Sequence, residues 1–220
     1  MNAEIETVEP GKHDREQRER CLIEAATHVF AAKGYDAATT REIAERSGCS
    51  EGLIHRYFGG KRGLLMAILR AKSEAARDIV RSGVPDSDDL HDEIKSIMLW
   101  SLQFMWEQRD FMRVTSGQGI VDPEIGRFIG TALNGERANV IAEKLRRHLA
   151  AGRIRDDVDV DVVAQAISGL SYQSGFFLQV VFDVDAAEVR RMVREIAHVI
   201  TRGIESDSNR EGHAETRITS

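Results

Sequence analysis

Apolar residues recur with the spacing of amphipathic helices along nearly the whole chain. Between positions 14 and 33, Leu22, Ala26 and Phe30 fall on one stripe, and Gly34 follows where a helix would end. The same periodicity predicts further helices over about residues 40–47, 51–58, 61 onward, 90–107, 111–116, 123–151, 160–182 and 186–205. Since no segment shows the alternation of a strand, the pattern predicts an all-α fold of about nine helices.

The two short helices near the N-terminus have clear start and stop signals. Thr39 and Glu42 have the spacing of a capping box, in which each side chain accepts a hydrogen bond from the other residue's backbone amide. Ser50 is a favourable N-cap for the second helix, and glycines follow both helices. Two short helices joined by a tight glycine turn, behind a longer helix, match the helix-turn-helix pattern.

The charge is unevenly distributed along the chain. The 220 residues carry a formal net charge of -6, yet residues 39–62 contain five basic and three acidic residues, a net charge of +2. The rest of the chain therefore carries -8. A small basic module on an acidic body favours a protein that contacts phosphate groups with one end only.

The chain lacks the motifs of exported, membrane-spanning, metal-dependent and catalytic proteins. It begins with no secretion signal, and its most apolar run, 176–182, is too short to span a bilayer. Its two cysteines suit a reducing cytosol. The spacing of Asp157, Asp159 and Asp161 imitates a calcium-binding loop, but the glycine and glutamate that such a loop needs are missing. We therefore expect a cytoplasmic protein without metal, cofactor or enzymatic activity.

One stretch of the chain resembles a known family. The run 39–58, followed by Lys61 and by Leu64 and Leu65, is similar to the DNA-binding signature of the tetracycline-repressor (TetR) family. The resemblance covers about residues 15–70. It implies a homodimeric all-α regulator with a three-helix, helix-turn-helix DNA-binding domain at its N-terminus.

The resemblance also implies how the chain is divided. We expect the DNA-binding domain over 14–72 and a larger helical domain, which binds a small-molecule effector and forms the dimer, over 73–205. The terminal segments 1–13 and 206–220 are polar or aperiodic, and we expect them to be disordered.

Candidate DNA contacts follow position by position from the resemblance. Thr40 and Tyr57 correspond to phosphate contacts, and Lys61 to the phosphate-binding lysine after the aromatic pair. Leu53 and His55 stand where the family usually has a Thr and a Tyr, so one hydroxyl is missing and one contact is shorter. Base edges are approached at Arg41, Glu51, Gly52 and Arg56. The full predicted set is Thr40, Arg41, Ser50, Glu51, Gly52, Leu53, His55, Arg56, Tyr57 and Lys61.

Most of the aromatic residues lie in the middle and late helices, where they could line a pocket for a hydrophobic or aromatic effector. Trp100 and Phe104 are four positions apart, as are Tyr172 and Phe176. The predicted ligand-binding residues are Trp100, Phe104, Met105, Phe111, Met112, Phe128, Tyr172 and Phe176. The alternative is that these side chains fill the core.

The last two predicted helices carry apolar residues on more than one face, which indicates a homodimer interface. A dimer would place two reading helices about 34–36 Å apart, in successive major grooves of a near-palindromic operator. We interpret the chain as a transcriptional repressor that a small, largely hydrophobic effector releases from double-stranded DNA. The alternatives are a regulator of the same fold without an effector, and an all-α ligand-binding or enzymatic protein that no longer reads DNA.

Overall fold

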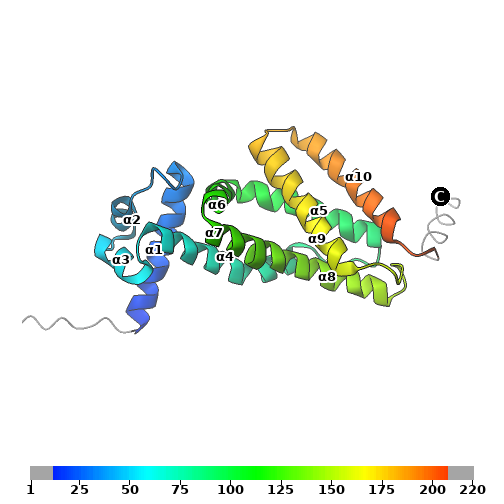
Figure 1. Cartoon of the computed structure of the whole chain (residues 1–220), viewed down its shortest axis with the longest axis horizontal. Coiled ribbons are helices and arrows are strands. Elements are labelled where there is room, and N and C mark those ends of the chain that lie inside the picture. Colours follow the sequence, from blue (N-terminus) through cyan, green and yellow to red (C-terminus); the bar gives the residue numbers. More distant parts are fainter. Residues whose placement is uncertain (1–11, 208–220) are drawn as a thin grey trace, which may run out of the picture. The chain divides into compact units, whose positions relative to one another are not determined.

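The computed structural model describes residues 12–207, and nearly all of them are helical (Figure 1). In chain order the elements are α1 (Lys12–Lys33), α2 (Thr40–Ser47), α3 (Glu51–Phe58), α4 (Lys61–Gly83), α5 (Leu90–Glu107), α6 (Arg109–Val121), α7 (Pro123–Phe128), η1 (Ile129–Asn134), α8 (Gly135–Ala150), α9 (Val160–Tyr172), η2 (Gln173–Val181) and α10 (Ala186–Ile204). The segments η1 and η2 are π-helical. Within 12–207 there is no strand, and the predicted all-α fold is confirmed, with ten α-helices.

The sequence predicts a short helix over 111–116 and none over 117–122, but the structure has one longer helix here, α6. It continues to Val121 through Gly117 and Gly119, where the sequence suggested a break. A Cβ atom on Gly119 would lie 3.1 Å from the Ile129 side chain, and one on Gly126 would lie 2.5 Å from the Gly119 carbonyl oxygen. The predicted helix end at 116 was wrong, since α6 continues through both glycines, and Gly119 and Gly126 let α6 and α7 approach closely.

The chain divides into two compact units after Ala71. Helix α4 begins in the first unit and continues into the second. The terminal segments that we expected to be disordered lie mostly outside the described residues. Ser206, the first residue of one of them, donates from its backbone amide to the Arg153 carbonyl oxygen at 3.0 Å.

In the first unit, α2 packs against both α1 and α3. The predicted capping box is present: the Thr39 hydroxyl accepts from the Glu42 amide at 3.2 Å, and the Glu42 carboxylate accepts from the Thr39 amide at 3.1 Å. A Cβ atom at Gly63 would lie 1.6 Å from the Phe58 carbonyl oxygen. Only glycine therefore lets α4 begin this close to the end of α3. The side chains that are fully buried in this unit include Leu22, Ile43, Ile54, Leu64 and Leu65.

In the second unit, α8 packs against α9, and α10 packs against α5 (Figure 1). The apolar faces of these helices form one core, which includes Leu90, Ile94, Ile97, Leu145, Ile167 and Val193. None of the helices over 12–207 is long and apolar enough to cross a membrane. In the same part of the chain, no group of three or more His, Cys, Asp or Glu side chains is placed to hold a metal ion.

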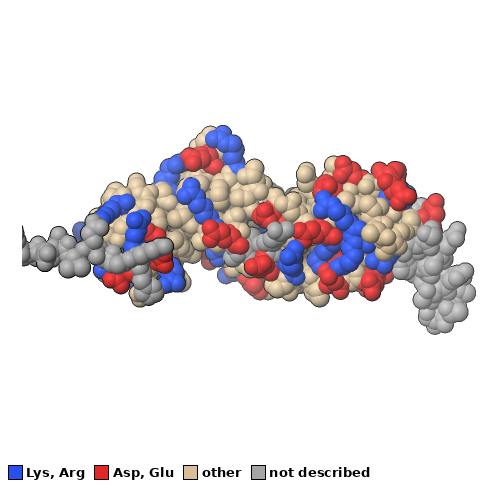
Figure 2. All heavy atoms as spheres, turned by 90° about the horizontal axis from the view of Figure 1, so that it is seen from below, with Lys and Arg blue, Asp and Glu red and all other residues tan. Residues whose placement is uncertain are grey.

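Charged side chains of both signs are interspersed on the surface. On the face in Figure 2, Lys and Arg lie among Asp and Glu and are not separated from them. Ion pairs such as Arg146 with Asp161, and Arg81 with Glu143, join charges of opposite sign at the protein surface.

A buried carboxylate, Glu93 of α5, joins α5 to α8. It accepts hydrogen bonds from Nζ of Lys144 at 3.1 Å, Nη2 of Arg147 at 2.6 Å and Nε2 of His148 at 2.6 Å. The other ring nitrogen of His148, Nδ1, accepts from Nε of Arg153 at 2.8 Å, so the hydrogen of the ring lies on Nε2 and faces Glu93. Every polar group in this cluster thus has a partner within the unit.

The cluster also keeps two carboxylates ionised. Burial alone would raise the pKa of Glu93, but the hydrogen bonds from His148, Lys144 and Arg147 hold it below its usual range. Hydrogen bonds from Arg147 and Lys144 also keep the pKa of Asp86 well below its ordinary value. Because a depressed pKa stabilises the folded state only while the group is ionised, this stabilisation is present at neutral pH and is lost in acid.

We expect Glu93→Gln to lower the free energy of unfolding at pH 7 by about 3–5 kcal/mol, because Lys144 and Arg147 would lose their buried partner charge. As the pH falls from 7 to 3, the variant should lose less stability than the wild type. Urea denaturation at several pH values measures both effects. Glu143→Gln, which removes a more exposed pair with Arg81, is the matched control and should change stability by less than about 1 kcal/mol. Equal effects of the two variants would contradict the role given to Glu93.

Candidate DNA interface and effector cavity

Helix α3 presents a polar face to the solvent. Ile54 is completely buried, whereas Glu51, Gly52, His55 and Arg56 are exposed. A Cβ atom on Gly52 would meet nothing within 4 Å. The predicted base-reading residues of α3 therefore share one accessible surface, at which the backbone at Gly52 is uncovered. Of the remaining α3 residues in the predicted set, Leu53 is half-buried.

The beginnings of α2 and α3 are tied together. The Thr40 hydroxyl donates to the Glu51 carboxylate, which joins the first residues of the two helices. Arg41 is largely exposed and pairs with Glu45 at 3.0 Å. Ser50 occupies the N-cap position of α3, but its side chain makes no capping hydrogen bond. The predicted contacts at the ends of both helices thus lie side by side.

The Lys61 side chain has a structural role that the sequence did not reveal. Its ammonium group donates to three backbone carbonyl oxygens, those of Tyr35 at 2.8 Å, Ala38 at 3.1 Å and Asp36 at 3.3 Å. It also lies 4.4 Å from the centroid of the Tyr35 ring. Lys61 therefore holds the loop between α1 and α2, and its contact with phosphate stays a prediction.

The aromatic pair before Lys61 also packs within this unit. The Tyr57 ring lies edge-on to Phe58, with 6.3 Å between the ring centroids, and the Arg15 guanidinium lies 5.1 Å from the Tyr57 centroid. Both aromatic side chains are half-buried. Arg15 thus adds a positive charge beside Tyr57, one of the predicted phosphate contacts.

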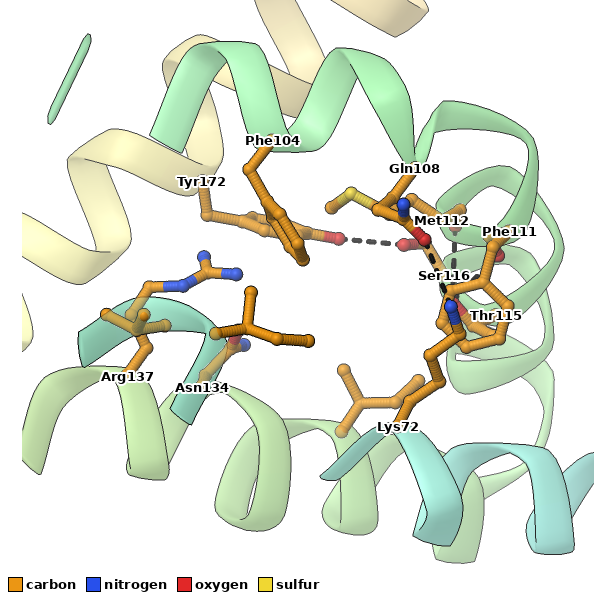
Figure 3. Close-up of a pocket in the computed structure, with 13 residues that line it drawn as sticks. Lys72, Phe104, Gln108, Phe111, Met112, Thr115, Ser116, Asn134, Arg137 and Tyr172 are labelled. Carbon is orange, nitrogen blue, oxygen red and sulfur yellow. Dashed lines mark hydrogen bonds between the residues drawn. The ribbon is translucent and has the colours of Figure 1, made fainter. Parts of the chain in front are cut away.

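The second unit contains a cavity of about 120 Å³ (Figure 3). Residues from α4, α5, α6, η1, α8 and α9 line it: Lys72, Ile79, Val80, Phe104, Gln108, Phe111, Met112, Thr115, Ser116, Ile129, Asn134, Arg137 and Tyr172. One π-helical segment, η1, contributes Ile129 and Asn134 to the lining, and the other, η2, begins directly after the lining residue Tyr172. Such segments are often found at functional sites.

Four of the eight residues predicted to bind a ligand line the cavity: Phe104, Phe111, Met112 and Tyr172. The other four do not. Met105 and Phe176 are buried in a small core cluster with Val180, against which the lining residues Phe104, Met112 and Tyr172 pack. Trp100 stacks on Phe104 at 5.1 Å between ring centroids and packs tightly on Gly83, while Phe128 is half-buried outside the lining.

The sequence reasoning missed the polar side of the cavity. Nζ of Lys72 donates to Oε1 of Gln108 at 3.1 Å and lies 5.4 Å from the centroid of Phe111. The hydroxyl groups of Ser116 and Tyr172 share a hydrogen bond of 2.8 Å. These residues come from positions up to 100 apart in the chain. Charged and polar residues on amphipathic helices ordinarily indicate a solvated face, so no local signal pointed to them.

Arg137, in the first turns of α8, is the exception among these polar groups. Its side chain is more than nine-tenths buried, and neither Nε nor Nη1 has a hydrogen-bond partner. Burial lowers the pKa of Arg137 to about 10, although nearby Tyr172 opposes the shift. The guanidinium therefore remains charged at neutral pH. Figure 3 shows it on the same side of the cavity as Tyr172, with Lys72 on the opposite side.

Comparison with known proteins identifies relatives of both units. Residues 22–68 match the family described as bacterial regulatory proteins, tetR family. The HTH-type (helix-turn-helix) transcriptional repressor Rv1474c of Mycobacterium tuberculosis is 30% identical over 148 residues, which are 66% of this chain and 74% of that protein.

Solved structures share the fold. A TetR-family transcriptional regulator from Mesorhizobium loti superposes with a TM-score of 0.74 at 18% identity, covering 87% of this chain and 98% of the other. The regulator FadR of Bacillus subtilis, in complex with stearoyl-CoA, superposes with a TM-score of 0.67 at 19% identity, covering 84% and 98%.

The open space at Gly52 leads to a prediction that separates folding from DNA binding. Gly52→Ala should raise the free energy of unfolding by about 0.4–1 kcal/mol, because alanine restricts the unfolded chain and nothing in the folded unit obstructs the new methyl group. The same methyl group would lie between α3 and a DNA groove. We expect DNA affinity to fall at least about tenfold, the effect of losing 1.4 kcal/mol.

Fluorescence anisotropy with labelled DNA and thermal denaturation measure the two effects of Gly52→Ala. Gly117→Ala is the matched control, since a methyl group added to this exposed helical glycine of α6 would also meet nothing within 4 Å. It should stabilise the chain without changing DNA affinity. Unchanged DNA affinity of Gly52→Ala would contradict a close approach of α3 to DNA.

Proposed function

The chain belongs to the TetR family of bacterial regulatory proteins, and we propose that it represses transcription as a homodimer that a small effector releases from its operator. The observation that carries this proposal is the exposed polar face of α3, held by α2 and the glycine turns inside a segment that matches the family. The family consists of transcriptional regulators and is not one of enzymes.

The geometry supports a reading role for α3. An exposed helix beginning with Glu51, with an uncovered backbone at Gly52 and the Arg56 side chain on the same surface, suits end-on entry into a major groove. Contacts to phosphate at the edges of the groove would come from Thr40 and Tyr57, beside which lies the Arg15 guanidinium. Near-palindromic double-stranded DNA is the partner expected for two such units.

Exposed apolar side chains support a homodimer formed by the second unit. Val162 of α9, Phe182 after η2 and Val199 of α10 are 59%, 63% and 67% exposed. A monomer would leave these apolar side chains in water, whereas a two-fold contact between the same helices would bury them on both protomers. Dimerisation through this unit would also provide the second reading helix that a palindromic site needs.

The cavity supports control by a ligand. The relative Rv1474c is a transcriptional repressor, and the structure of FadR contains stearoyl-CoA. In this chain α4 begins at Lys61 in the first unit and provides Lys72, Ile79 and Val80 to the cavity wall in the second. A ligand that favours one position of this wall would act on the helix that leads to the DNA-binding unit. Release then requires different ligand affinities in two states of the dimer.

The first test is a titration of the full chain against labelled DNA from upstream of its own gene, with scrambled DNA as the control. We expect two protomers or a multiple of two per site and a strong preference for the natural sequence. Because phosphate contacts release counterions, affinity should fall at least about 10³-fold between about 50 and 200 mM salt. Sequence-independent binding to both the upstream DNA and a pool selected from random DNA would contradict the proposed function.

A further inference from the structure

The cavity of the second unit holds a cation without a counter-charge. A buried charge that lacks partners is costly, and proteins normally pair such groups. Glu93 and its cationic partners follow this rule in the same unit. Arg137 does not, since Nε and Nη1 have no partner and the side chain is more than nine-tenths buried.

The lining cannot supply the missing charge. Of the described residues that line the cavity, none is Asp or Glu, and two are basic, Lys72 and Arg137. Lys72 is half-buried, and its ammonium donates to Gln108 at 3.1 Å and lies 5.4 Å from the centroid of the Phe111 ring. Arg137 lies across the cavity from Lys72 (Figure 3) and faces no comparable group. An anion in the cavity would therefore find its strongest partner at Arg137.

The size and the walls of the cavity limit what the rest of such an anion can be. A volume of about 120 Å³ is close to the roughly 150 Å³ of an engineered apolar cavity that binds benzene. Aromatic and aliphatic side chains such as Phe104, Met112 and Ile129 form much of the wall. An inorganic anion would leave these surfaces without a partner, and a long acyl chain would exceed the volume.

We propose that the effector is a compact organic acid, a carboxylate on an apolar body of about one aromatic ring, which pairs with the guanidinium of Arg137. The planar fork of arginine can donate two parallel hydrogen bonds to a carboxylate. The apolar body would then contact Phe104 and Met112, with the Ser116–Tyr172 hydroxyl pair beside it. This inference rests on the proposed ligand-responsive function and names the chemical class of the ligand.

The test is isothermal titration of the full chain with three acids, benzoate, phenylacetate and hexanoate, and with their neutral amides. At least one acid should bind the wild type at least about tenfold more tightly than its amide, because only the acid neutralises Arg137. Arg137→Met should lose this preference. Arg146→Met is the matched control, since this exposed arginine of the same helix pairs with Asp161 and does not line the cavity, and it should keep the preference.

A thermal melt of the ligand-free variants provides a second readout and confirms that they fold. Arg137→Met should melt at a higher temperature than the wild type, because it replaces an unpaired buried charge with an apolar side chain. A lower melting temperature would show that the guanidinium has partners in the free protein. That result, or equal affinities of every acid and its amide, would overturn the proposal.

The same preparations are titrated with operator DNA so that two failures can be told apart. Specific DNA binding without a preference for acids would overturn the anionic effector and leave the regulatory function intact. A preference for acids that depends on Arg137, without specific DNA binding, would overturn the regulatory function and support the ligand chemistry. Inorganic phosphate serves as a further probe, and binding as tight as that of the acids would contradict an apolar body.

Discussion

A charge removed from water needs a partner, and the second unit depends on this constraint at both ends of α8. Toward the C-terminal end, Lys144, Arg147 and His148 converge on the buried carboxylate of Glu93. Near the N-terminal end, Arg137 is buried without such a partner. The C-terminal part of α8 is therefore bound to α5 through Glu93. At its N-terminal part, the charge of Arg137 has no counter-charge until an anion enters the cavity.

The end of α8 that carries Arg137 is also the end at which α-helical geometry gives way to π-helical geometry. The π-helical segment η1 precedes Gly135, and it contributes Asn134 and Ile129 to the same cavity. A π-turn departs from the regular hydrogen-bonding pattern and often marks a functional site. The ligand would thus bind where the helix is irregular, while the Glu93 cluster anchors the opposite end.

The first unit, in contrast, is defined by local constraints. The capping box at Thr39, the left-handed glycines at 48 and 59 and the close approach at Gly63 fix α2, α3 and the beginning of α4. Lys61 adds three hydrogen bonds to the preceding loop. Such a unit has little freedom to change internally when a ligand binds elsewhere. Regulation would then act through the relative placement of two rigid reading units in the dimer.

This difference explains how much the sequence alone could predict. Capping boxes, glycine ends and helical periodicity are local signals, so the helix-turn-helix and nearly all helix boundaries were predictable. Helix α6 continues through Gly117 and Gly119, and the second of these glycines allows a close contact with another helix, which no local pattern records.

The polar part of the candidate site could not be predicted for a related reason. Arg137 follows Glu136 in an amphipathic pattern that is typical of a solvated helix face, and only tertiary packing buries it. The spacing of Trp100 and Phe104 correctly placed them on one side of their helix. Only Phe104 lines the cavity, because Trp100 packs on Gly83 instead. The resemblance predicts a phosphate contact for Lys61, but its structural role could not be predicted, because the loop carbonyls that it binds are more than twenty positions away.

The central claim is that binding of the effector and binding of DNA are thermodynamically coupled in this protein. Such coupling is reciprocal: each ligand must change the affinity for the other by the same factor. The measurement is the affinity of an acid that binds the cavity, determined for the free dimer and for the dimer saturated with operator DNA. The affinity should be lower on DNA by the same factor, about 5–150-fold, by which the acid weakens DNA binding. Equal affinity on and off DNA would contradict the claim, because a ligand that binds both states equally cannot shift the equilibrium between them.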